Sequence, residues 1–274
     1  MVSRYMREDM LSLSWRVFSL LFVTLVVSIY FSSAHAAVVE KLRVDEITIN
    51  GTIDSDTVRK VEEVIDGNIS TVAIASAGGD FEAAMELGRL IRQHHATLFV
   101  SKYCLAACAQ WIFVAAEKRI VDKDTVVAFL ATMSALKFMV SRDDDSKVRE
   151  FFLNKSEMEE RYYEEIGVSK ILLYQPALSL FVPCYNVIYR QDKAVSDIQA
   201  THRFYGWVPS IGYLNSVNIS SKGYWPLNKL EFMQAITAGN KFNNQAAFIQ
   251  DESIHPRDLG DAKEELSKTR RCAK

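Results

Sequence analysis

The chain has 274 residues, of which 49% are hydrophobic and 24% charged, so it can form one large globular domain or two small ones. Its formal net charge is −2, and no basic stripe interleaved with aromatic residues is present, which excludes a typical nucleic-acid-binding protein. Four cysteines and five histidines lack the spacing of metal ligands, so we predict no metal ion and no cofactor.

The N-terminus has the three parts of a secretory signal peptide. Basic residues precede an uncharged apolar run at residues 17–31, and small residues follow at Ala34 and Ala36. We expect cleavage after Ala36, a single mature domain at residues 37–274, and a periplasmic or secreted location. A membrane-spanning helix needs about 20 apolar residues, so the alternative is an uncleaved anchor that leaves the domain facing the periplasm.

Hydrophobic spacing along the first half alternates between the periods of strands and helices. Strands are expected at 40–53 (one or two), 70–76, 96–103 and 119–130, with helices from a cap at Asp54 or Asp56 to Gly67, at 81–95 and at 106–117. This order predicts βαβ units, and therefore an α/β fold with a parallel sheet and right-handed crossovers.

The second half is less regular. A charged and exposed helix is expected at 144–166, ending at Gly167, followed by a helix at 169–178 that Pro176 bends or breaks. Loops and short strands are expected at 183–225, a helix with Pro226 in its first turn at 226–237, and an amphipathic helix at 256–268.

The cysteines are interpreted in the light of export, since an oxidising compartment permits disulfides. Cys104 and Cys108 are four residues apart around a helix start, which places their Cα atoms about 6 Å apart and within bridging range. We predict a bridge between them, with two buried free thiols as the alternative. The sequence does not predict how Cys184 and Cys272 pair.

Two strand ends are expected to meet at one edge of the parallel sheet, where ligands bind in such folds. One end leads to Gly78 and Gly79, whose backbone can approach a ligand closely. The other leads to Ala107 at a helix start, where amide groups lack partners. Gly78, Gly79 and Ala107 could thus form an oxyanion hole, although the two glycines by themselves also suit a simple tight turn.

Residues 70–130 resemble the Clp-protease/crotonase superfamily, and in particular its exported, Clp-protease-like periplasmic proteins. In those proteins one strand leads to S-x-G-G-D, a helix ends in I-R, another strand leads to C-x-S-A-C, and a later strand carries a histidine. The matching residues here are Ser76, Gly78, Gly79, Asp80, Ile91, Arg92, Cys104, Ala107, Cys108 and Arg119. The resemblance implies a Clp-protease/crotonase-like fold of repeated ββα and βαβ units, and assembly into a homo-oligomer.

The departures from this pattern concern the catalytic residues themselves. The nucleophilic serine of the family falls on Ala106, and its general-base histidine falls on Leu130 or a neighbour. An alanine has no oxygen for attack, and a leucine cannot accept a proton. The third member of the triad, an acid late in the chain, cannot be located. We therefore predict no catalytic residue.

The histidines do not refill the vacant positions. His94 and His95 end the helix at 81–95, about 20 Å along its axis from Gly79, and there they suit the helix dipole. The segments that hold His202 and His255 cannot be placed, and their roles stay open.

The leading hypothesis is an exported, non-catalytic binding or scaffold protein that holds a peptide or acyl group at the glycine turn. One alternative is a crotonase-like enzyme that uses only the oxyanion hole, although coenzyme-A thioesters are unexpected outside the cytoplasm. Another is a peptidase or esterase with a relocated nucleophile, such as Ser101 or Ser134.

Overall fold

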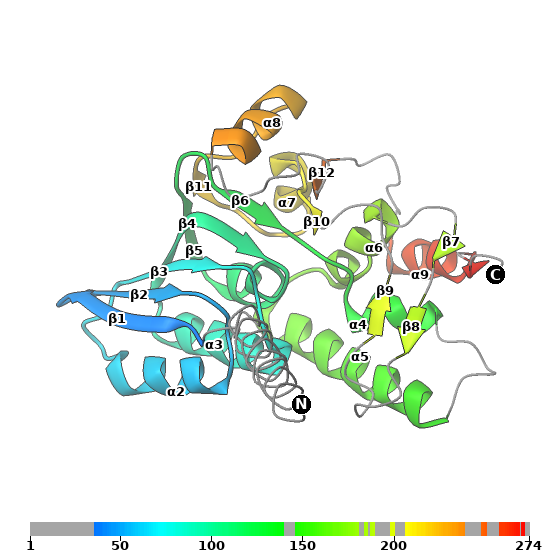
Figure 1. Ribbon diagram of the computed structural model, residues 1–274, viewed down its shortest axis with the longest axis horizontal. Coiled ribbons are helices and arrows are strands. Elements are labelled where there is room, and N and C mark those ends of the chain that lie inside the picture. Colours follow the sequence, from blue (N-terminus) through cyan, green and yellow to red (C-terminus); the bar gives the residue numbers. More distant parts are fainter. Residues whose placement is uncertain are drawn as a thin grey trace, which may run out of the picture. The chain divides into compact units, whose positions relative to one another are not determined.

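The computed structural model describes most of the chain downstream of the N-terminal segment (Figure 1). The described residues are 36–139, 146–180, 184–185, 187–189, 198–200, 206–238, 248–250, 258–268 and 270–271. Ala36–Lys274 forms one compact unit. The apolar run at 17–31, His202, His255, Cys272 and the side chain of Cys184 lie outside this description. Within the ranges given, no helix has the length and hydrophobicity needed to cross a membrane.

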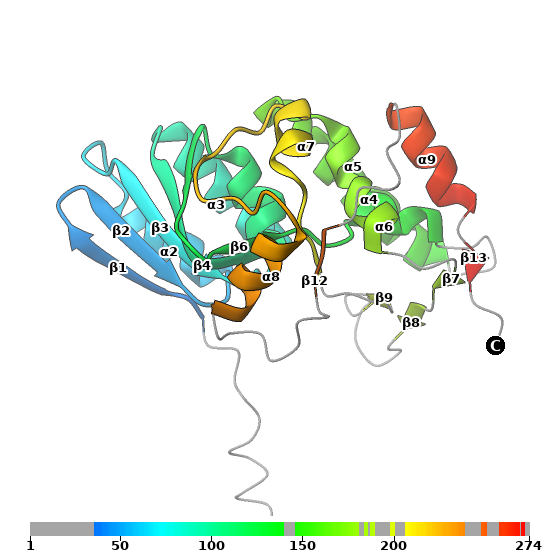
Figure 2. The same ribbon diagram turned by 90° about the horizontal axis from the view of Figure 1, so that it is seen from above.

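A seven-stranded, mostly parallel sheet is the framework of the unit (Figures 1 and 2). Its path runs β1-β2-β3-β4-β5-β11, and β6 pairs with β4 beside that path. Only the β1–β2 pair is antiparallel. The strands are β1 (Val38–Arg43), β2 (Glu46–Asn50), β3 (Thr71–Ser76), β4 (Thr97–Leu105), β5 (Lys118–Val121), β6 (Val126–Ala128) and β11 (Lys222–Gly223). The predicted α/β class with a mainly parallel sheet is confirmed.

Strand β4 changes partners halfway along its length. Its first half lies between β3 and β5, but the register with β3 jumps from Ile74–Val100 to Ser76–Cys104. Lys102 sits in this bulge with a left-handed φ of 65°. A bulge bends its strand, and the second half of β4 accordingly pairs with β6 instead of β5.

The single strand predicted at 119–130 is therefore wrong. A turn at Asp122–Thr125, with Asp124 at a φ of 59°, divides it into β5 and β6. Each part is parallel to a different half of β4.

Helices α2 (Ser55–Val64) and α3 (Phe81–Gln93) cover one face of the sheet (Figures 1 and 2). Both begin at an aspartate, as N-cap preferences dictate. Asp54 accepts from the Thr57 N–H at 2.8 Å in a capping box, and Asp80 accepts from the Ala83 N–H at 2.8 Å. Between β4 and β5 lies the helix of residues 107–115, called here the elbow helix, whose middle is the π-helical segment η1 (Cys108–Phe113).

The remaining helices follow β6 along the chain. They are α4 (Met133–Leu136), η2 (Lys137–Met139), α5 (Ser146–Ile166), η3 (Lys170–Leu173), α6 (Gln175–Leu180), α7 (Ile211–Ser216), α8 (Lys229–Ala238) and α9 (Leu259–Lys268). Small strand pairs accompany them: β7 (Cys184–Tyr185) with β13 (Arg270–Arg271), β8 (Val187–Tyr189) with β9 (Ile198–Ala200), and β10 (Gly206–Trp207) with β12 (Phe248–Ile249).

Helix α5 corrects the expectation of an exposed helix. One of its faces is charged, but the other buries Phe152, Ser156, Glu159, Tyr162, Tyr163 and Ile166. A second correction concerns Pro226, which precedes α8 instead of starting it. Asn228 caps that helix, because its side chain accepts from the Leu230 and Glu231 N–H groups. Pro176, as expected, marks a break: it lies in the first turn of α6, directly after η3.

Two buried threonines beside β6 differ in the hydrogen bonding of their hydroxyl groups. Thr125 and Thr132 are 2% and 3% exposed. The Thr125 hydroxyl has no hydrogen-bond partner within the part of the chain that the structure describes. The Thr132 hydroxyl donates to the Leu173 carbonyl at 2.6 Å and accepts from the Ala135 N–H at 3.2 Å.

We expect Thr125→Val to raise the free energy of unfolding by about 1 kcal/mol, because it removes an unsatisfied buried hydroxyl. Thr132→Val is expected to lower it by about 2 kcal/mol, because a helix cap and a buried hydrogen bond are lost. Urea unfolding of both variants measures the two changes in the free energy of unfolding. A loss of stability in Thr125→Val equal to that in Thr132→Val would contradict the assignment.

Candidate functional site

A strained strand-to-helix turn forms the centre of the candidate site. Ala106 lies between β4 and the elbow helix with a φ of 50°, a left-handed conformation that costs an ordinary L-residue about 1–2 kcal/mol. Its N–H donates to the Ala128 carbonyl of β6 at 3.0 Å, and its methyl group is half-buried. The α/β-hydrolases present their nucleophilic serine on a strained strand-to-helix turn.

The glycine turn after β3 packs directly against this elbow. Gly78 has a φ of 101°, and a Cβ atom on it would lie 2.9 Å from the Ala107 nitrogen and 3.1 Å from the Ala106 Cβ. Gly79 has a φ of 151°, and a Cβ there would lie 2.1 Å from the Ile53 carbonyl oxygen. No other residue fits either position without displacing backbone, so the close approach expected of these glycines is real.

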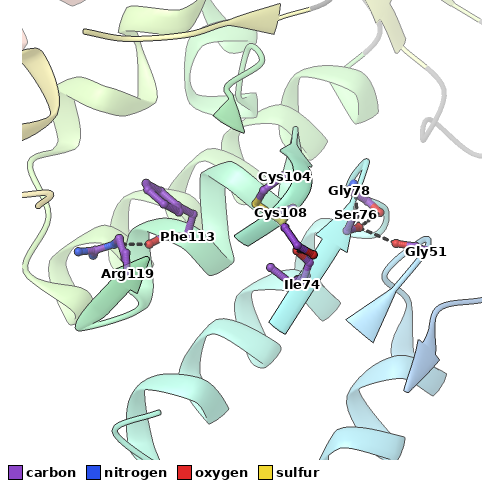
Figure 3. The surroundings of a disulfide bond; sticks show 9 residues. Gly51, Ile74, Ser76, Gly78, Cys104, Cys108, Phe113 and Arg119 are labelled. Carbon is purple, nitrogen blue, oxygen red and sulfur yellow. Dashed lines mark hydrogen bonds between the residues drawn. A yellow bond between two sulfur atoms is a disulfide. The ribbon is translucent and has the colours of Figure 1, made fainter. Parts of the chain in front are cut away.

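Ser76 holds the glycine turn in place from inside the fold (Figure 3). Its fully buried hydroxyl donates to the Gly51 carbonyl at 2.6 Å and accepts from the Gly78 N–H at 3.1 Å. Ser76 is the first residue of the matched S-x-G-G-D pattern, and its contacts give it a structural task.

The predicted disulfide between Cys104 and Cys108 forms across the elbow (Figure 3). The two Cα atoms are 5.2 Å apart, and both residues are fully buried. The alternative of two free thiols is thus wrong for the folded chain. Because Ala106 lies between the two cysteines in the sequence, the bridge closes a ring that contains the strained residue.

Two tyrosines of α5 satisfy carbonyls in the middle of the elbow helix. The Tyr162 hydroxyl donates to the Trp111 carbonyl at 2.8 Å, and the Tyr163 hydroxyl donates to the Gln110 carbonyl at 3.1 Å. Both rings contact the Trp111 ring edge-on, with centroids 5.9 and 5.7 Å apart. The π-helical turn, which interrupts the regular hydrogen-bond ladder, is therefore stabilised from outside the helix.

Two arginines satisfy the carbonyls at the end of the same helix. Arg119 donates from Nε to the Phe113 carbonyl and from Nη2 to the Val114 carbonyl at 2.7 Å, while Arg92 donates to the Ala115 carbonyl at 3.0 Å. Burial lowers the pKa of Arg119 to about 10, with a smaller effect from nearby Arg92. Arg119 thus stays charged at neutral pH. Both residues of the family pattern act as C-caps of the elbow helix.

Leu130, on which or beside which the resemblance places the general base, follows β6 and is half-buried. Its carbonyl accepts from the side-chain amide of Gln110, one turn into the elbow helix, and Phe129 before it pairs with Trp207. Hydrogen bonds therefore hold this loop on both sides. Leu130 itself carries an isobutyl side chain, which does not titrate.

A buried carboxylate that the sequence did not reveal anchors the next helix. Glu159 of α5 is 1% exposed and accepts from the N–H groups of Met133 and Ser134, at 2.9 and 2.6 Å. These amides open α4, three residues after Leu130, where the helix dipole favours a negative charge. Burial nevertheless raises the pKa of Glu159 to about 7.

The proposed replacement nucleophiles do not lie in a site. Ser134 is fully buried, and its hydroxyl donates to the Ser156 carbonyl at 3.3 Å inside the α4–α5 contact. Ser101 contacts the Ile74 carbonyl at 3.5 Å, on β4. Neither hydroxyl has a histidine partner among the contacts of the described residues, so the relocated-nucleophile hypothesis gains no support from the geometry.

The two neighbouring histidines lie where the sequence placed them. His94 is the C-cap of α3, and the His95 ring meets Glu117 at 2.9 Å, at the end of the helix remote from the glycine turn. Neither contacts Ala106 or Leu130.

Two backbone amides at the junction of the turn and the elbow, those of exposed Gly79 and buried Ala107, have no acceptor among the contacts of the described residues. The Gly78 N–H, expected to belong to the oxyanion hole, donates instead to the Ser76 hydroxyl at 3.1 Å, so that part of the prediction is wrong. The Gly79 N–H has no acceptor within the described ranges. The Ala107 N–H belongs to the first turn of the elbow helix, where amides have no intrahelical acceptor. Chemically, this arrangement can donate hydrogen bonds to a carbonyl or an anion. It supplies no nucleophile and no base.

No protein-family model and no curated protein matches the chain. Similar solved structures include Pseudomonas aeruginosa DspI, with 16% identity over 36% of this chain and 54% of that one, at a TM-score of 0.28. A probable enoyl-CoA hydratase/isomerase from Mycobacterium abscessus shares 13% identity over 34% and 48%, with a TM-score of 0.27. An enoyl-CoA hydratase from Thermoplasma volcanium GSS1 shares 9% over 76% and 78%, with a TM-score of 0.32.

The matched part spans about half the length of the first two of these proteins. At such identities and TM-scores, the similarities imply nothing about the activity of this chain. The α/β class rests on the topology of the sheet itself.

Glu159 predicts a pH dependence of stability. Its pKa is higher in the folded chain, about 7, than the ordinary value of 4.5, so its contribution to stability is complete below pH 4.5 and is lost as the pH rises to 7. We expect a loss of about 3 kcal/mol across this window. Glu159→Gln should abolish this part of the slope.

Glu157→Gln, at an exposed position of the same helix, is the control and should retain the wild-type slope. Chemical unfolding from pH 4.5 to 8 gives the three curves. Identical slopes for the Glu159→Gln variant and the wild type would show that Glu159 does not titrate in this range.

Proposed function

We propose that this is an exported protein of the Clp-protease-like type that binds a peptide or acyl group without cleaving it. The observation that carries the proposal is Ala106, a methyl group in left-handed conformation at the position that presents a nucleophile in related sites. The supporting residue is Leu130, where the related site needs an imidazole.

The contacts that hold the elbow in its strained conformation favour a binding function over the loss of all function. A strained φ persists only where the surrounding structure over-determines it. Here a disulfide, the Ala128 carbonyl and the glycine turn all hold Ala106 in place. Strain that several separate contacts maintain is typical of functional sites.

The ligand class follows from the available groups. The Gly79 and Ala107 N–H groups suit a carbonyl oxygen, as found in a peptide or an acyl group. Neighbouring Leu130 is apolar and suits an aliphatic chain. A homo-oligomer is part of the proposal and is measured by light scattering.

The crotonase-like alternative uses the same two amides and therefore deserves a direct test. Such an enzyme would turn over an acyl thioester with a base from elsewhere in the chain. Turnover of such a thioester by the wild type would favour this alternative over the binding protein.

Fluorophosphonate labelling tests the absence of catalysis. The mature wild type is expected to remain unlabelled, because Ala106 has no hydroxyl for attack and Leu130 cannot accept a proton. Ala106→Ser is also expected to remain unlabelled, since an unassisted hydroxyl is a weak nucleophile at neutral pH. Ala106→Ser with Leu130→His should show slow labelling, which intact-protein mass spectrometry can quantify.

Ala131→Ser with Leu130→His is the matched control, because its serine lies outside the elbow. It should not react. Stoichiometric labelling of the wild type at any serine would overturn the non-catalytic proposal.

The glycine turn supplies a second test, of binding. A Cβ at Gly78 would press on the Ala107 nitrogen, so Gly78→Ala is expected to weaken binding of a fluorescein-labelled apolar octapeptide amide at least about tenfold. Gly67→Ala is the control, because a Cβ there meets nothing within 4 Å. Fluorescence anisotropy measures both variants, after circular dichroism has shown that each is folded. Equal affinities would place the ligand elsewhere.

A further inference from the structure

The residues around the expected cleavage point are part of the folded domain. Ala36 pairs with Thr52 in a parallel bridge, and the Ala37 N–H donates to the Thr52 carbonyl at 2.9 Å. Ala37 is only 1% exposed. The bond between Ala36 and Ala37 is thus held in extended backbone at the edge of the sheet, directly before β1.

A glycine makes room for this segment. Gly51 has a φ of 123°, and a Cβ atom on it would come within 3.1 Å of the Ala37 Cα. Its N–H donates to the Ala75 carbonyl at 3.1 Å, and its carbonyl accepts from Ser76. Residues 36–37 therefore rest on the same stretch of backbone that supports the glycine turn.

Proteolysis requires a segment that is accessible and free of hydrogen bonds to the rest of the domain. A peptidase binds the residues on both sides of the bond that it cleaves, and an extended segment in such a cleft offers its own backbone hydrogen bonds to the enzyme. The Ala37 amide is already bonded to Thr52, and its side chain is buried. Cleavage of the folded chain would first require β1 and its leading residues to detach.

We infer that the bond between Ala36 and Ala37 is a processing site that is open only before the domain folds. Hydrolysis there adds one water molecule across the peptide bond and leaves a carboxylate on Ala36 and an ammonium group on Ala37. Folding then places the new amino group against the Thr52 carbonyl. A chain that folds first keeps its N-terminal segment. The inference rests on the secretory leader included in the proposed function.

The test compares one precursor in two states. The full chain, residues 1–274, is added from urea to detergent micelles that contain a bacterial signal peptidase, or is refolded in the same micelles before the enzyme is added. We expect the unfolded chain to yield the 37–274 product by mass spectrometry. The folded chain should be cut about 100-fold more slowly, because cleavage follows the population of the detached state.

A variant with a ten-residue Gly/Ser linker inserted between Ala37 and Val38 is the control. The linker frees the bond from β1 while the rest of the domain can fold, so this precursor should be cut at similar rates in both states. Thermal melting checks that it is folded.

The outcomes separate the two ideas. Equal rates for the folded and unfolded wild-type precursor would overturn the inference and leave the leader in place. A lack of cleavage at this bond in the unfolded chain would overturn the leader and, with it, the inference. Neither result depends on what the glycine turn binds.

Discussion

Backbone carbonyls that leave water must each meet a hydrogen-bond donor, and this requirement organises the structure around the elbow helix. Its carbonyls at Gln110, Trp111, Phe113, Val114 and Ala115 receive donors from side chains of α3, of α5 and of β5. Three elements, from α3 before the helix to α5 well after it, are thereby fixed to one helix. The turn at Ala106, directly before that helix, is therefore held in place by the same contacts.

The same requirement separates what the sequence could predict from what it could not. Periodicity and capping are local, so the first helices and their caps at Asp54 and Asp80 could be recognised from neighbouring residues. The division of the strand after the elbow was not recognisable, because it depends on a bulge at Lys102 on another strand. Neither residue type nor hydrophobic pattern indicates that bulge.

For the site, the pattern of strand ends and glycines located the elbow and the glycine turn, and the resemblance to a known family supported them. The disulfide followed from cysteine spacing together with the expected export. The buried partners were missed for a physical reason. Glu159 and the two tyrosines belong to a helix whose many charged residues indicate exposure, and its long buried face becomes visible only when the helix is packed. Arg92 and Arg119 matched the family pattern, but their targets are backbone carbonyls, which carry no residue-specific signal.

The disulfide has a consequence for the chain before it acquires any tertiary structure. Cys104 and Cys108 are separated by only four positions, so the ring they close can form in a nascent polypeptide without help from distant segments. A ring this small removes little entropy from the denatured ensemble and adds correspondingly little to thermodynamic stability. What it changes is the shape of that ensemble. Unfolded molecules that carry the bridge remain bent at the position of the elbow, and each refolding event starts from a chain already turned there.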